Sequence, residues 1–176
     1  MRTAALLSSA LFVLFNSQCW ADPGNTIDRL DWMIGEWSFD DQEVNGDYRE
    51  TGSRVCTWTL DKKYIQCANS GTNHRGKERT TVWYISYNSM DERYEIVGMF
   101  GDYPRKNLYV ATPDETGHVV ELVNESWSAD GMVPMNLATI TYDGGDEWLW
   151  EIRTGQPNPE TGAHPVTFRD LAVRVD

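Results

Sequence analysis

Basic residues are scarce in this sequence. Lys and Arg together number 15 against 27 Asp and Glu, which gives a formal net charge of −12 at pH 7. Nucleic acids and anionic lipids are bound through basic patches and the counterions that these patches displace. The composition therefore excludes nucleic acid as a partner and argues against binding to an anionic membrane surface.

Long apolar runs are also missing. The longest run, residues 4–15, contains Ser8 and Ser9 and is shorter than the about 20 residues that a membrane-spanning helix needs. No later segment is continuously apolar. We therefore expect no membrane span.

The short apolar run has the features of a secretory signal. Met1-Arg2 places a positive charge before it, and Cys19-Trp20-Ala21 has the small-x-small pattern of a cleavage site. We expect a signal peptide over residues 1–21 and a mature protein exported to the periplasm or the cell exterior. A lipoprotein signal is the weaker alternative, because Gln18 is not the small residue that should precede the cysteine.

Cysteine is rare, and its placement is informative. With Cys19 inside the predicted signal, Cys56 and Cys67 are the two that remain, and they stand at equal distance from Asp61-Lys62. A hairpin that turns at this pair would place the two thiols opposite each other on adjacent antiparallel strands. In an exported protein this arrangement predicts a disulfide rather than a metal site or a catalytic thiol.

Recognisable catalytic and metal-binding motifs are absent from the sequence. It has no Gly-x-Ser-x-Gly elbow, no His-Glu-x-x-His and no phosphate-binding glycine loop. The three histidines, His74, His118 and His164, lie in or beside different predicted turns and show no ligand spacing. We therefore expect surface histidines, no metal site and no cofactor.

The dominant pattern is an alternation of apolar and polar residues in short runs separated by turn residues, which is typical of an antiparallel sheet. The helical signal is limited to about one turn near residues 26–33. No change in composition marks a second domain, so we expect one domain over residues 22–176. The ten predicted runs are 34–41, 52–60, 63–72, 78–87, 93–100, 107–112, 118–124, 135–142, 147–154 and 166–175.

The faces of these runs indicate how the sheet closes. Gly144-Gly145 predicts a two-residue hairpin loop, which would set Thr141 opposite Trp148 and leave apolar side chains on both faces. A sheet of about ten strands with two partly apolar faces tends to curl and close, because closure removes its exposed edges. We therefore predict an all-β, antiparallel up-and-down barrel, wide enough for its side chains and one small ligand.

Two segments carry a family resemblance. Gly35-Glu36-Trp37, after a short helical turn, resembles the Gly-x-Trp start of lipocalin-like, or calycin, barrels. The segment from Cys56 to Cys67 is similar to the second hairpin of a group of exported bacterial barrels in that set, largely of unknown function. The resemblance implies that Trp37 packs across the barrel floor beneath a late arginine, for which Arg169 and Arg174 are both candidates.

The resemblance adds little about ligands. The Thr-Asp-Tyr motif of true lipocalins is absent, so their ligand preference does not transfer. Some related barrels hold haem through a histidine near the last strand. His164 is the nearest match by position but lacks a motif, so the expectation of no cofactor stands.

Aromatic residues are the candidate ligand-binding residues. The sequence has 8 Trp, 8 Tyr and 5 Phe, which either fill a core, their commoner role, or line a cavity. Indole N–H and phenol groups could orient a bound molecule. The six candidates on predicted strands are Trp37, Trp58, Trp83, Tyr84, Trp148 and Trp150.

Three functions remain open at this point. The first is an exported barrel that binds a small apolar or aromatic molecule without catalysis. The second is an enzyme that acts on a small hydrophobic substrate inside the barrel, and the third is a solid barrel that serves as a protein-interaction module. A ligand-sized cavity would argue against the third, and a buried ionisable group facing it would favour the second. We expect inward positions to be mainly aromatic, aliphatic or Thr.

Overall fold

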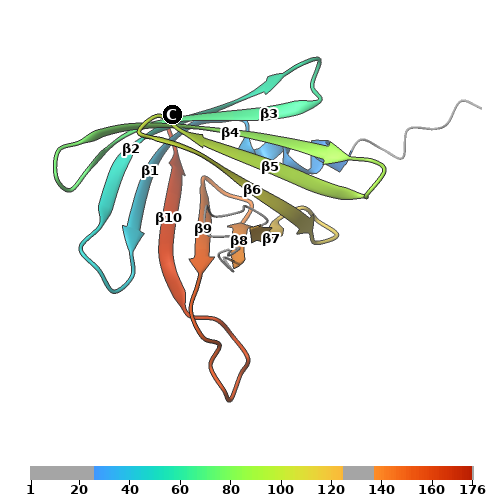
Figure 1. The fold of residues 1–176 in the computed structure, drawn as a ribbon. Coiled ribbons are helices and arrows are strands. Elements are labelled where there is room, and N and C mark those ends of the chain that lie inside the picture. Colours follow the sequence, from blue (N-terminus) through green and yellow to red (C-terminus); the bar gives the residue numbers. More distant parts are fainter. Residues whose placement is uncertain (1–25, 125–136, 176) are drawn as a thin grey trace, which may run out of the picture.

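The structure is a computed structural model, and it describes residues 26–124 and 137–175 (Figure 1). The predicted signal peptide, residues 1–21, lies outside this part of the chain, as do the first two residues of the predicted run 135–142. Among the described residues, no helix has the length and apolar character needed to cross a membrane.

The described residues form a closed antiparallel barrel in which each strand pairs with its neighbours in sequence and the last pairs with the first. The predicted fold class is confirmed. A short 3-10 helix, η1, precedes the barrel. The elements are η1 Thr26–Met33, β1 Gly35–Glu43, β2 Arg49–Thr59, β3 Tyr64–Asn73, β4 Glu78–Asn88, β5 Arg93–Phe100, β6 Tyr103–Pro113, β7 Val119–Asn124, β8 Leu137–Tyr142, β9 Glu147–Arg153 and β10 Val166–Arg174.

Each predicted run corresponds to a strand, and the largest difference is at β6. This strand begins at Tyr103 rather than at residue 107. The connection from β5 is only the turn Gly101-Asp102, in which the Gly101 amide donates a 2.8 Å hydrogen bond to the carbonyl of Thr80. The register of β5 and β6 shifts between Met99 and Phe100, and this irregularity breaks the alternation that marks a strand in sequence.

The β2–β3 hairpin has the predicted register and the predicted disulfide. Cys56 lies directly opposite Cys67, and the two sulfurs are bonded. The chain reverses at Asp61-Lys62, where both residues have positive φ and the Lys63 amide donates a 3.0 Å hydrogen bond to the carbonyl of Leu60. Equal spacing of the cysteines from the turn was therefore sufficient to predict the pairing.

The predicted register of the β8–β9 hairpin is wrong by one residue. Trp148 lies opposite Tyr142, not Thr141. The loop is one residue longer than a two-residue turn, and the Asp143 carboxylate accepts a 2.9 Å hydrogen bond from the Gly145 amide inside it. The corrected register places Ile140 on the same buried face as Trp148 and leaves Thr141 exposed.

One end of the barrel is closed by η1. Ile27, Leu30 and Met33 recur every three residues, as a 3-10 helix requires for one face, and all three are buried. Trp37 is fully buried beside them, and its indole N–H donates a 2.8 Å hydrogen bond to the Met33 carbonyl. The helix η1 is therefore fixed to β1 both by packing and by this hydrogen bond from a strand side chain to a helix carbonyl.

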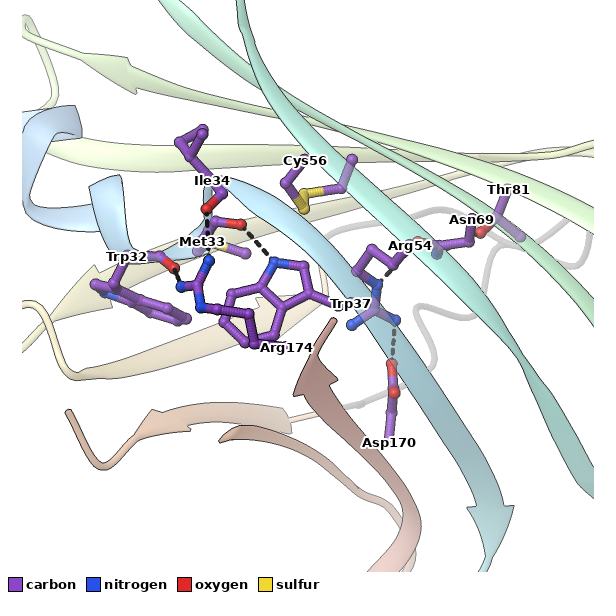
Figure 2. The surroundings of a disulfide bond; sticks show 11 residues. Trp32, Met33, Ile34, Trp37, Arg54, Cys56, Asn69, Thr81, Asp170 and Arg174 are labelled. Carbon is purple, nitrogen blue, oxygen red and sulfur yellow. Dashed lines mark hydrogen bonds and ion pairs between the residues drawn. A yellow bond between two sulfur atoms is a disulfide. The ribbon is translucent and has the colours of Figure 1, made fainter. Parts of the chain in front are cut away.

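Arg174, near the end of β10, holds this closed end together (Figure 2). Its guanidinium lies 4.1 Å from the centre of the Trp37 ring and donates hydrogen bonds of 3.1 Å to the carbonyls of Trp32 and Ile34. Arg169, the other candidate, instead forms a 2.9 Å ion pair with Glu151 on the outside. The arginine on the first-strand tryptophan is therefore Arg174.

Removing the disulfide should lower the free energy of unfolding by about 3 kcal/mol, because the bond reduces the number of conformations that the unfolded chain can adopt. For a domain of this size this corresponds to a melting temperature lower by roughly 6–12 °C. The measurement is thermal unfolding of wild-type protein and the Cys56→Ser/Cys67→Ser variant in oxidising buffer. Both proteins should melt alike after reduction, and equal melting in oxidising buffer would remove the disulfide from the account.

Replacing Arg174 by Met should destabilise the barrel by about 2–4 kcal/mol, since it removes a cation–π contact and two charged hydrogen bonds to carbonyls. Arg169→Met is the matched control on the same strand, and it should change stability by less than about 1 kcal/mol because its ion pair is exposed. Urea unfolding of both variants gives the comparison. Similar losses for the two would show that Arg174 has no special role.

Candidate functional site

A cavity of about 360 Å³ lies inside the barrel, in the half away from η1. Its wall combines aromatic rings with charged and polar groups, and Ile152 is its aliphatic member. The aromatic residues are Phe39, Trp83, Phe100, Tyr109, Trp150 and Phe168, and the polar residues are Asp41, Tyr48, Glu50, Arg54, Asn69, Arg79, Thr81, Asn107 and Asp170.

Trp83 is at the centre of the aromatic part of the wall. Its ring centre lies 4.8 Å from that of Trp150, 6.0 Å from that of Phe100 and 6.1 Å from that of Tyr109. Gly98 faces it across β4 and β5, and a Cβ there would lie 2.8 Å from the ring. The missing side chain at residue 98 therefore provides the space in which the indole lies.

Three carboxylates in the cavity wall form a row across three adjacent strands. Asp41 on β1 lies directly opposite Glu50 on β2 and directly opposite Asp170 on β10. Directly opposed side chains on neighbouring strands lie close together on the same face, and like charges there repel. These carboxylates are not a metal-binding cluster: within residues 26–124 and 137–175, no group of three potential ligands is placed to hold a metal ion.

Arg54 compensates the charge of one end of this row. It is 4% exposed and forms a short ion pair with Asp170, as well as a 2.8 Å hydrogen bond to the Asn69 side chain (Figure 2). Its guanidinium lies 4.5 Å from the centre of the Trp148 ring. The Asn69 amide in turn donates a 2.7 Å hydrogen bond to the Thr81 hydroxyl, so this end of the row is held by a continuous network.

Arg79 compensates the other end. It forms a 2.8 Å ion pair with Glu50 and donates a 2.6 Å hydrogen bond to the Tyr48 hydroxyl. That hydroxyl itself donates a short hydrogen bond to Glu50. Burial, together with this bond to a carboxylate, raises the pKa of Tyr48 to about 12, so the phenol remains protonated at neutral pH.

Asp41, in the middle of the row, has no ion pair or hydrogen bond from its side chain to any described residue. The pKa of Asp41 is raised to about 7. Burial is the largest cause, and the negative charges of Asp170 and Glu50 raise the pKa more than the positive charges of Arg54 and Arg79 lower it. Asp41 is therefore a carboxyl group that changes charge near neutral pH while facing a cavity.

Two of the six predicted ligand-binding residues line this cavity, namely Trp83 and Trp150. Trp37 and Trp148 are buried but belong to the packed layer beneath it, where each is covered by an arginine. The other two lie elsewhere. Trp58 packs against the core near η1 and donates a 3.1 Å hydrogen bond to Asp31.

Tyr84 is next to Trp83 in β4 and is half-buried. Successive residues of a strand point to opposite faces, so Tyr84 is directed away from the interior. It lies opposite Gln66 and Val97 on the neighbouring strands. The structure therefore gives this residue no contact with the cavity.

The buried positions are mainly aromatic or aliphatic, as expected, but the charged residues among the inward positions were not predicted. Asp41, Glu50, Arg54 and Asp170 all face the interior. The signal that could have revealed the first of them is the spacing from Trp37, because residues two apart in a strand share a face. Residue 41 is four positions beyond that inward tryptophan.

No family model matches the chain, and no curated protein matches it. Among solved structures, a redesigned β-barrel, mFAP1, bound to DFHBI is 11% identical, with a TM-score of 0.44 over 82% of this chain and 96% of that one. A second, EF1p2_mFAP2b bound to DFHBI, is 10% identical, with a TM-score of 0.46 over 84% and 97%. With TM-scores below 0.5, these likenesses carry no argument about the cavity.

The buried row should make stability depend on pH through Asp41. Its pKa is raised in the folded state, so between about pH 4 and 7 the folded protein keeps a proton that the unfolded chain releases. The contribution of Asp41 to stability therefore falls as pH rises through this window and is level above it. At pH 8, Asp41→Asn should be more stable than wild type by about 2–4 kcal/mol, and the difference should vanish near pH 4.

Urea unfolding at several pH values measures this difference. Asp40→Asn is the matched control, because Asp40 is the preceding residue and pairs with Arg49 on the outside. Its effect should not change sign or size between pH 5 and 8 by more than a few tenths of a kcal/mol. A pH-independent difference between Asp41→Asn and wild type would contradict the burial of this carboxyl group among like charges.

Proposed function

We propose that this protein is an exported barrel that binds a small molecule with an aromatic body and a polar end. The observation that carries the proposal is the cavity of about 360 Å³, whose wall combines aromatic rings with charged groups. Ligand sites in proteins begin at about 300 Å³ and combine apolar walls with a few placed polar groups. A barrel filled solid with side chains, as an interaction module would be, does not fit a cavity of this size.

Buried polar atoms support the polar end of the ligand. Nη1 of Arg54, Nε1 of Trp150 and Oδ1 of Asp170 are buried and have no hydrogen-bond partner within the described residues. All three residues line the cavity. Polar groups without partners beside a cavity favour a ligand that carries a polar group of its own. The ligand is therefore more polar than the small apolar or aromatic molecule expected from sequence.

Catalysis is the second candidate, and Asp41 is the observation that favours it. A carboxyl group with a pKa of about 7 that faces a cavity can accept and donate protons at neutral pH. Tyr109 is a weaker candidate, because burial raises the pKa of its phenol to about 12. Binding remains the first proposal, since the Tyr48 hydroxyl, which is paired with the Glu50 carboxylate in the cavity wall, has a raised pKa and is therefore a poor nucleophile at neutral pH.

The proposal includes the compartment and the family. Residues 1–21 would be removed as a signal peptide, and residues 22–176 would form one exported domain. The Cys56–Cys67 disulfide is compatible with an oxidising compartment. Trp37 beneath Arg174 agrees with the floor expected for a lipocalin-like barrel, and we place the chain with the exported members of that group.

A ligand-observed NMR screen of aromatic fragments tests the binding proposal. Asn107→Trp should fill the cavity, because Asn107 is one of its lining residues, and should reduce the affinity of every hit at least tenfold. Lys106→Trp is the matched control, since it adds the same ring at the adjacent, exposed position. The control should bind as wild type does.

Two results would contradict the proposal. One is the absence of any hit from a library of several hundred fragments, and the other is hits whose affinity is unaffected by Asn107→Trp. Circular dichroism of both variants establishes that they are folded. Turnover of a hit, abolished by Asp41→Asn without loss of binding, would instead support the catalytic candidate.

A further inference from the structure

The charges that line the cavity do not balance. Three carboxylates face two guanidinium groups there, so one negative charge is left over when all three acids are ionised. Arg54 is committed to Asp170 and Arg79 to Glu50. The unmatched charge therefore belongs to Asp41.

The position of Asp41 makes this charge accessible to a ligand. It is the middle residue of the row, with an acid directly opposite it on each neighbouring strand. A single positive group placed at the middle of the row would be attracted by all three carboxylates at once. Because the pairs with Arg54 and Arg79 lie at the two ends, it would not have to break either of them.

The aromatic part of the wall suits the rest of such a molecule. Trp83, Phe100 and Trp150 form a cluster of rings that an aromatic body would contact, and Trp150 on β9 lies directly opposite Asp170, beside the row. Trp150 is 8% exposed, and its indole N–H has no hydrogen-bond partner in the described residues. Arg54 is likewise buried, with Nη1 unpartnered.

We propose that the ligand is an organic monocation, an alkylamine attached to an aromatic body, whose ammonium group binds at Asp41 between Glu50 and Asp170. This inference rests on the proposed function and names the class of its ligand. A metal ion is the alternative cation, and the described residues do not converge on one. An organic anion would instead meet three carboxylates with only already paired arginines in compensation.

Binding of such a cation is linked to the protonation of Asp41. The charged groups around Asp41 are Glu50 on β2, Asp170 on β10, Arg54 on β2 and Arg79 on β4. Without ligand the acids outweigh the arginines, and the carboxyl group holds its proton up to about pH 7. An ammonium beside it favours the ionised form, so binding releases a proton and affinity rises as pH increases toward 8.

The test is a binding screen with fragments in matched sets of three, in which the same aromatic body carries an amine, an alcohol or a carboxylate. The naphthylethylamine, naphthylethanol and naphthylpropionate set is one example. Amines should bind at least tenfold more tightly than their alcohol partners at pH 8, and carboxylates should bind more weakly than alcohols. Calorimetry of the best amine in buffers of different ionisation enthalpy should show proton release near pH 7.

Asp41→Asn locates the effect. It should lower the affinity of the amine at least tenfold at pH 8, abolish the rise in affinity with pH and leave the alcohol unaffected. Asp40→Asn, whose carboxylate pairs with Arg49 outside, should bind the amine as wild type does. The pH profile of the wild-type protein remains decisive if the Asp41 variant does not fold.

The outcomes separate this inference from the function on which it rests. Absence of binding by all three members of every set overturns the proposed function itself. Tight binding of alcohols or carboxylates, blocked by Asn107→Trp, supports the binding function and overturns the cationic ligand. Amine binding that does not vary between pH 6 and 8, or that survives Asp41→Asn, also overturns it.

Discussion

The pairing of β1 on both of its edges is the constraint on which the rest of this structure depends. Its register with β2 and β10 closes the barrel, and the two-residue period of the strand then sets three inward levels, at Trp37, Phe39 and Asp41. Arg54 and Arg174 flank the first level. A shift of one residue on either edge would turn all three side chains outward and destroy floor and cavity together.

Each level has a different physical role. The lowest joins η1, β1 and β10 through Trp37 and Arg174, and it gives the barrel a closed end. At the middle level, Phe39 lies opposite Gly52 and Ala172, whose small size leaves room above the floor. The upper level is acidic. The repulsion between its carboxylates is relieved at the two ends of the row, where Arg54 pairs with Asp170 and Arg79 with Glu50, but not at Asp41 in the centre. The closed end and the cavity of the barrel are thus stacked along one strand.

The sequence was sufficient for the architecture because the alternation, the turn residues and the spacing of Cys56 and Cys67 are local signals. It was less informative about the cavity, because lining residues come from strands that are distant in sequence. Trp83 and Trp150, which line the cavity, were candidates on residue type alone. The acid row was not, since Asp170 meets Asp41 only when the two ends of the chain pair. The sequence also could not show whether Arg174 or Arg169 covers Trp37, because this depends on the register between β1 and β10, the strands that close the barrel.

The central claim is that Asp41 is held inside the barrel among like charges without a guanidinium partner. The most direct test is a carbon-13 NMR titration of the Asp41 side-chain carboxyl group in the ligand-free protein. The account predicts a pKa of about 7 for this group. Titration at its ordinary value near 3.8 would mean that the carboxylate is solvated or paired, and would contradict the structure of the site described above.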